Sequence, residues 1–211
     1  MDVQPYEQRL RQDRIWGRQQ ADSFFMRVGP VYQALEDLTR RLEEARISYA
    51  LVGALALREH GLNRETVNVN ILVTKEGLAA FRERYEGWGY VPAFPGAQKQ
   101  FRAAENGVRI DFITTGEFPG DGKPKPVAFP DPAVVSVEIN GLRVIALERF
   151  IELKLASGMT NIHRGQDLVD VQNLIREVHL SKDLVNHLDA SVRGEYGKLW
   201  QYAQMKDPLD G

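Results

Sequence analysis

Gly53–Asn70, which reads Gly-Ala-Leu-Ala-Leu-Arg-Glu-His-Gly-Leu-Asn-Arg-Glu-Thr-Val-Asn-Val-Asn, is the stretch of sequence that decides the fold. It follows a short apolar strand, Tyr49–Val52, and opens with a glycine at the turn from strand to helix. Glycine there lets the backbone approach a ligand closely, and the N-terminus of the next helix presents N–H groups suited to phosphate. The helix Ala54–His60 is capped by Gly61, and Val67–Val73 alternates as a strand does. The sequence therefore predicts a strand–helix–strand unit.

Asn68 and Asn70 lie at positions i and i+2 of the second strand, so their side chains are expected on the same face of the sheet. Together with Gly53 they resemble the active-site signature of the polymerase-beta-type nucleotidyltransferase superfamily. In that superfamily a Gly-Gly or Gly-Ser pair opens a helix, and a strand then presents Asp-x-Asp to bind divalent metal. This chain keeps the spacing, but it has Ala54 in the second helix position and asparagine in both aspartate positions.

The resemblance implies a catalytic and metal-binding set made of Asp111, Asn68 and Asn70, with Asp111 in the position of the third carboxylate. Such carboxylates hold Mg²⁺, which bridges the triphosphate. Asparagine keeps the shape and a carbonyl oxygen but loses the charge and cannot act as a base. Because a metal contributes several kcal/mol of transition-state stabilisation, the loss of both carboxylates is expected to cost roughly three or more decades in rate.

Arg64 and Thr66 occupy the Arg-x-Thr positions that many small members of the superfamily carry ahead of the first aspartate. The resemblance implies a nucleotide-binding role for both residues, with Gly53 and Ala54. A guanidinium can contact phosphate in a bidentate manner, which favours a phosphate contact for Arg64 over a structural role beside the sheet. Thr66 is expected to act mainly in the structure.

The segments Glu148–Gly158 and His163–Val171 resemble the downstream part of the same small nucleotidyltransferases, which include the toxins of type IV toxin–antitoxin systems. There a helix lysine reaches the phosphates, and an Arg…Lys-Asp-x-x-Asp segment opens the next helix. The matching nucleotide-binding residues in this chain are Lys154, Arg164, Asp167 and Asp170. Two roles for the lysine stay open, a contact with phosphate and a structural pair with one of the two aspartates, whose i,i+3 spacing places them on one helix face.

The remaining elements are predicted from periodicity and turn chemistry. Asn106-Gly107 and Asn140-Gly141 indicate two-residue hairpin turns, and the proline-rich stretch 117–132 indicates a long loop beside the site. Ser181 is a candidate cap for a further short helix. The other predicted elements are a polar helix or arm at 1–26, helices at 31–46, 76–86, 147–157 and 165–178, and strands at 100–104, 108–113, 134–139 and 142–146.

This order of elements fits an α+β fold, a nucleotidyltransferase-like mixed sheet flanked by helices. The resemblance covers residues 45–178, and the predicted organisation is an N-terminal helical arm at 1–30, a nucleotidyltransferase-like domain at 31–180 and a C-terminal helical extension at 181–211. The chain has 211 residues, a net charge of −2 and no cysteine, which excludes disulfides and thiolate metal sites. No apolar stretch is long enough to cross a membrane, and a cytoplasmic location is expected.

Two functions follow from these residues. The first is transfer of NMP from an NTP to an RNA, a protein hydroxyl or a small-molecule acceptor, with Mg²⁺ as cofactor and with the activity impaired or lost. The second is a pseudoenzyme, a non-catalytic module that binds nucleotide or works through a protein partner at its N-terminal helices. Natural divergence and a deliberate double Asp→Asn change both stay open as the origin of the asparagines.

Overall fold

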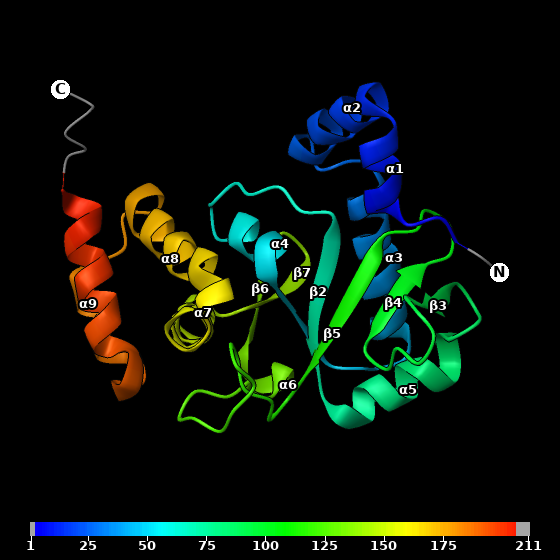
Figure 1. Cartoon of the computed structure of the whole chain (residues 1–211). Coiled ribbons are helices and arrows are strands. Elements are labelled where there is room, and N and C mark those ends of the chain that lie inside the picture. The colour runs from blue at the N-terminus through cyan, green and yellow to red at the C-terminus, as the bar shows by residue number, and fades with distance from the viewer. Residues whose placement is uncertain (1–2, 206–211) are drawn as a thin grey trace.

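A mixed β-sheet forms the centre of the protein (Figure 1). A computed structural model describes residues 3–205 of the chain. Within this range the sheet has seven strands in the order β3-β4-β5-β2-β1-β7-β6. The strands are β1 (Tyr49–Val52), β2 (Asn68–Val73), β3 (Tyr90–Pro92), β4 (Gln100–Ala103), β5 (Arg109–Thr114), β6 (Ser136–Ile139) and β7 (Leu142–Ile145).

Helices flank the sheet and continue the chain at both ends (Figure 1). In order they are α1 (Tyr6–Gln12), α2 (Arg14–Phe25), α3 (Pro30–Glu44), α4 (Gly53–Glu59), α5 (Lys75–Tyr85), α6 (Pro132–Val135), α7 (Leu147–Thr160), α8 (Gly165–Glu177) and α9 (Ala190–Gln204). Short 3₁₀ turns cover Ile162–Arg164 and Lys182–His187. Together with the mixed sheet, these helices confirm the predicted α+β class.

Strand β2 is the central strand, and its neighbours run in opposite senses. It pairs antiparallel with β1 and parallel with β5. The parallel register places Asn70 beside Asp111 and Asn68 beside Arg109. Residues at i and i+2 share a face, so these four polar side chains lie on the same side of the sheet. The pairing thus brings Asp111 to the two asparagines, as the resemblance implied.

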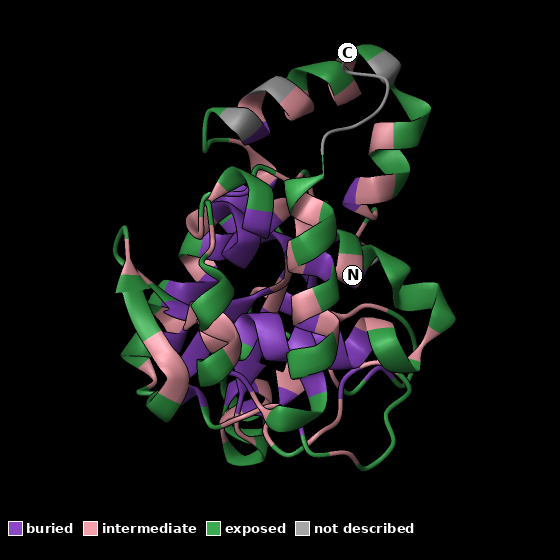
Figure 2. Cartoon of the chain, turned by 90° about the vertical axis from the view of Figure 1, so that its left-hand side faces the viewer, coloured by how far each residue is buried: buried purple, intermediate pink, exposed green. Residues whose placement is uncertain are grey.

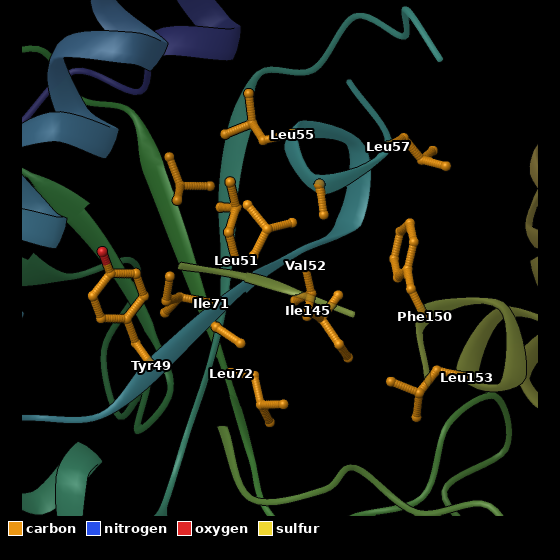
Figure 3. Packing of buried hydrophobic residues seen from close by; sticks show 14 of the residues in the cluster. Tyr49, Leu51, Val52, Leu55, Leu57, Ile71, Leu72, Ile145, Phe150 and Leu153 are labelled. Carbon is orange, nitrogen blue, oxygen red and sulfur yellow. The ribbon is translucent and has the colours of Figure 1, made fainter. Parts of the chain in front are cut away.

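The core fills the space between the sheet and the helices (Figure 2). Buried strand residues such as Leu51 and Ile71 pack with Leu55 and Leu57 of α4 (Figure 3). Phe150 points from α7 toward the same cluster. Burial of this apolar surface is the main stabilising contribution to folding, and it fixes α4 and α7 beside the strand ends that carry the polar residues.

Helices α3 and α5 follow the predicted patterns. The four residues at helical spacing in α3 are all buried, namely Val31, Leu35, Leu38 and Leu42. Thr74 caps α5, because its side chain accepts a hydrogen bond from the backbone N–H of Gly77. Both helices therefore lie within two residues of the ranges predicted for them, 31–46 and 76–86.

Several local predictions were wrong. Val134 and Val135 belong to the helical turn α6, in which Pro132 takes the first position and Asp131 caps the N-terminus. The first hairpin turns through four residues, 104–107, because Gly107 N–H donates to the carbonyl of Ala103. Strand β3 was missed, and α9 was predicted only as part of the helical extension at 181–211, without its own bounds. The turn at Asn140-Gly141 is the predicted two-residue type, with positive φ at both residues.

The N-terminal residues are docked on the sheet. Tyr6 N–H donates to the carbonyl of Gly107, and both carboxylate oxygens of Glu7 accept from Arg102. At the other end of the chain, Tyr196 and Leu199 of α9 are buried. The boundaries predicted at residues 30 and 180 stay predictions, and residues 1–2 and 206–211 of the predicted arm and extension lie outside the described residues. None of the helices described between residues 3 and 205 has the length and apolar character required to cross a bilayer.

Candidate functional site

The floor of the site is formed by β2, β5 and the glycine that follows β1. Gly53 has φ +69°, a left-handed conformation that favours glycine. A Cβ built at Gly53 would lie 2.5 Å from Nδ2 of Asn70. A residue with a side chain would therefore need both a strained backbone and a displaced Asn70, so the predicted requirement for glycine at this turn has a direct steric cause.

The amide of Asn68 is held between two neighbours. Its Nδ2 donates to Oδ2 of Asp111 at 2.5 Å, and its Oδ1 accepts from the Thr66 hydroxyl at 2.8 Å. An ionised carboxylate can only accept hydrogen bonds, so it requires the NH₂ side of the amide to face it. The carbonyl side of Asn68 is consequently turned away from Asp111 toward Thr66, whose hydroxyl donates a hydrogen bond to it.

Asp111 is contacted by a second donor that the sequence did not single out. Nε of Arg109 donates to the same Oδ2 at 3.1 Å. The other oxygen, Oδ1, is buried and has no hydrogen-bond partner among the described residues. Two N–H donors on one oxygen give Asp111 the surroundings of an anion that is neutralised within the protein.

These residues do not fit a magnesium site. Mg²⁺ requires near-octahedral oxygen ligands, which in proteins are mainly carboxylates and phosphates. Here Asp111 supplies one carboxylate, and Asn68 and Arg109 both donate hydrogen bonds to its Oδ2. Within residues 3–205 no group of three His, Cys, Asp or Glu side chains is suited to hold a metal ion. We therefore derive no catalytic step through a metal.

A buried ion network closes the opposite wall, between α7 and α8. Nζ of Lys154 lies 2.8 Å from Asp167 and 2.7 Å from Asp170, and the three side chains are 7%, 8% and 2% exposed. Ser157 donates to Asp167 at 2.6 Å. Of the two roles left open for Lys154, the pairing with aspartate is therefore present, and it involves both aspartates.

Two arginines complete this network from the solvent side. Arg64, on the segment between α4 and β2, contacts Asp170. Arg164 donates through Nε to Asp167 at 3.0 Å. Burial acts to raise the pKa of Asp167, but the charges of Lys154 and Arg164 and the hydrogen bonds from Lys154 and Ser157 together outweigh it. The pKa therefore lies below its ordinary value. Asp167 is therefore ionised at neutral pH and anchors both a lysine and an arginine.

A cavity of about 680 Å³ lies between the two walls. Apart from Asp170, which lies behind Arg64, all the predicted site residues line it, namely Gly53, Ala54, Arg64, Thr66, Asn68, Asn70, Asp111, Lys154, Arg164 and Asp167. The proline-rich loop contributes Phe118 and Phe129 to the lining, which agrees with its predicted place beside the site. Gly120 of this loop packs on α7, since a Cβ there would lie 2.7 Å from the carbonyl oxygen of Ser157.

Sequence reasoning missed several lining residues. Arg109 lies two residues before Asp111 on the same strand, so the two side chains share a face of the sheet. This spacing could have identified Arg109 as a residue of the site. Ser157 could have been noticed as a hydroxyl three residues after Lys154. Gln100 and Phe118 had no signal, because neither a lone glutamine nor a phenylalanine in a loop indicates a cavity. Helix α4 begins at Gly53, and its first two residues, Gly53 and Ala54, line the cavity.

Several solved structures are similar to this chain in fold. The complex of ANT(2'')-Ia with adenylyl-2''-tobramycin is similar with a TM-score of 0.51, covering 78% of this chain and 97% of that chain at 12% identity. At this identity the similarity shows the fold alone, and the chain has a nucleotidyltransferase-like fold.

Two further structures have lower TM-scores. JHP933 from Helicobacter pylori matches with a TM-score of 0.45, covering 82% of this chain and 90% of that chain at 17% identity. A nucleotidyltransferase candidate from Thermotoga maritima matches with 0.44, covering 67% and 91% at 17% identity. No protein-family model matches the chain. No curated protein sequence matches it either.

Proposed function

We propose that this chain is a nucleotide-binding protein that uses the nucleotidyltransferase-like fold without magnesium and does not transfer NMP. One observation carries the proposal, the contact of Asp111 Oδ2 with the Asn68 amide and the Arg109 guanidinium. In a metal-dependent site a cation would neutralise this carboxylate. Here the protein supplies the positive partner itself, so the oxygen is already neutralised when a ligand enters.

The cavity has the size and the lining that a nucleotide requires. Its volume of about 680 Å³ lies within the roughly 300–1,000 Å³ typical of small-molecule sites. Arginines line its polar side, and Phe118 and Phe129 supply flat apolar surface from the loop. Guanidinium groups suit phosphate, whereas aromatic rings suit a planar base. The structural neighbour ANT(2'')-Ia was solved with an adenylylated product, which is consistent with a nucleotide in this type of cavity.

NMP transfer is the function that this geometry disfavours. Without two carboxylates the predicted loss is roughly three or more decades in rate, and the donors around Asp111 oppose its use as a base. The resemblance to type IV toxins, an RNA or protein acceptor, and a protein partner at the N-terminal helices stay predictions from the sequence.

Calorimetric titration with ATP, GTP, CTP and UTP tests the proposal, each in EDTA and in excess Mg²⁺. Binding of at least one nucleotide in EDTA is expected, and it should weaken in Arg64→Gln. The matched control is Arg84→Gln, because Arg84 is exposed on α5 away from the cavity. Binding that requires magnesium, or no binding of any nucleotide, would overturn the proposal. Incubation with labelled NTP and acceptor pools is expected to give no labelled product.

A further inference from the structure

The asparagines change the charge of the cavity by the amount that one magnesium ion carries. Four cationic side chains line it, Arg64, Arg109, Lys154 and Arg164, against three carboxylates, Glu65, Asp111 and Asp167. Asp170, in contact behind them, adds a fourth carboxylate. This set is electrically neutral, whereas aspartates at positions 68 and 70 would give it a charge of −2. A phosphate ligand therefore meets the same net charge here as in the acidic site with one bound Mg²⁺.

Arg109 places a positive charge beside Asn68, at one of the positions where the acidic site would bind Mg²⁺. It is the cross-strand neighbour of Asn68 and is held by Asp111 through Nε. A guanidinium has five N–H donors in a planar fork, and within the described part of the chain Arg109 uses one of them, in its hydrogen bond to Asp111. Its side chain is 41% exposed and lines the cavity. The carboxylate thus holds the arginine at the cavity, and its remaining N–H donors are available to a ligand.

Arg64 and Arg164 are arranged in the same manner. Each is anchored by a buried aspartate, Asp170 for Arg64 and Asp167 for Arg164, and their side chains are 38% and 56% exposed. Both line the same cavity as Arg109. An arginine that is already positioned loses less conformational freedom when it binds. Three such arginines around one cavity form a site built for an anion.

We infer that Asn68, Asn70 and Arg109 together replace one divalent cation, so that the cavity takes a phosphomonoester without magnesium, such as a nucleoside monophosphate. This inference rests on the proposed function for the identity of the ligand. A nucleoside triphosphate carries Mg²⁺ when the ion is available. In this cavity the Mg²⁺ ion would lie close to the positive charge of Arg109, and Asp111 is the one carboxylate beside it that could bind it. A monophosphate binds Mg²⁺ weakly and brings no such cation.

Magnesium alone gives the first test, which requires no nucleotide. The melting temperature is measured with and without Mg²⁺ for the wild type, for Asn68→Asp/Asn70→Asp, and for the same double variant with Arg109→Gln. We expect no shift for the wild type and the largest rise for the triple variant, because it has three carboxylates and no competing guanidinium. A rise in the wild type would overturn the inference, and so would a folded triple variant with no rise. Circular dichroism establishes that each variant is folded, and if the triple variant does not fold, the wild-type shift decides.

AMP and ATP give the second test, by calorimetry in EDTA and in excess Mg²⁺. AMP affinity should be independent of Mg²⁺, whereas ATP affinity should fall when Mg²⁺ is added. Arg109→Gln should weaken AMP binding by about ten-fold or more, the value of a charged hydrogen bond, and Arg84→Gln should leave it unchanged. Stronger ATP binding with Mg²⁺, or an unaffected Arg109→Gln, would overturn the inference while nucleotide binding itself stands. Absence of all nucleotide binding would overturn the proposed function, and the magnesium test would still decide whether the cation has been replaced.

Discussion

Replacement of Lys154 by methionine is predicted to destabilise the fold strongly. Methionine keeps an unbranched stem of similar length but removes the ammonium, which lies 2.8 Å from Asp167 and 2.7 Å from Asp170. Both carboxylates are almost completely buried. Breaking a buried ion pair by removing one partner costs roughly 3–5 kcal/mol. Because Arg64 and Arg164 still contact the two aspartates, we expect the lower end of this range, about 3 kcal/mol.

Urea denaturation and thermal melting measure this cost. For a chain of this size, about 3 kcal/mol corresponds to a fall in the melting temperature of roughly 6–12 °C. Lys123→Met is the matched control, since Lys123 is exposed on the loop, and it should change the free energy of unfolding by less than about 0.5 kcal/mol. The variant Lys154→Met/Asp167→Asn/Asp170→Asn should recover much of the loss, because no buried charge is then left without a partner.

A different outcome would refute the structural role of Lys154. If Lys154→Met unfolds within about 0.5 kcal/mol of the wild type but loses nucleotide affinity, the lysine acts as a phosphate contact, and the network with Asp167 and Asp170 contributes little to stability. If stability and affinity fall together, the affinity measured at a temperature where Lys154→Met is fully folded separates the loss of the fold from the loss of a phosphate contact.

Three further predictions test other parts of the structure. Gly53→Ala should lower the free energy of unfolding by roughly 1–3 kcal/mol. This cost should exceed that of Gly141→Ala, because Gly141 has a similar positive φ but no atom within 4 Å of a Cβ built there. Equal costs in urea denaturation would show that the close contact with Asn70 does not contribute. Burial lowers the pKa of His60, so on acidification the unfolded state takes up a proton first, at about pH 6.5, and the free energy of unfolding should fall as the pH drops below that value. In His60→Gln the free energy of unfolding should change less over the same pH range. An equal change in the variant and the wild type would assign the effect to other groups. Arg102→Ala should release α1 from the sheet, because it removes both hydrogen bonds to Glu7. Limited proteolysis should then cleave the chain faster within the first 30 residues. An unchanged cleavage rate would show that Tyr6 and its neighbours suffice to hold the helix.

The central strands were predictable because their local patterns are strong. Alternation placed β2, the glycine marked the end of β1, and the i and i+2 positions put Asn68 and Asn70 on one face. The parallel pairing of β2 with β5 then confirmed the position implied for Asp111. Weak elements failed for physical reasons. Strand β3 has three residues and too little periodicity to detect, while the capping Asp131 and Pro132 override the strand preference of Val134 and Val135.

The charges of the site were less predictable than its backbone. The contact between Arg109 and Asp111 is local, but its importance depends on Asn68, which lies 43 positions before Asp111 and meets it only through the sheet. Lys154 had two possible roles because a helix lysine can reach a ligand or a carboxylate, and sequence spacing does not reveal which side of the helix faces α8. The structure shows the pairing with the two aspartates, and binding measurements remain the test of a phosphate contact.

Asparagine has different consequences at positions 167 and 170, which hold aspartate, and at positions 68 and 70, which hold asparagine. Asp167 and Asp170 each hold a buried or half-buried cation, so neutral replacements there would leave Lys154 buried without compensation, at a cost of several kcal/mol. Positions 68 and 70 lie beside Asp111, and an aspartate at 68 would place like charges at the 2.5 Å contact that the amide now makes. At an effective dielectric of 20, two unit charges about 4 Å apart repel by about 4 kcal/mol. A bound cation, or a proton held by one of the two carboxyl groups, would offset that repulsion. Without either, asparagine at position 68 is the more stable residue, and the fold itself favours the uncharged form of the site.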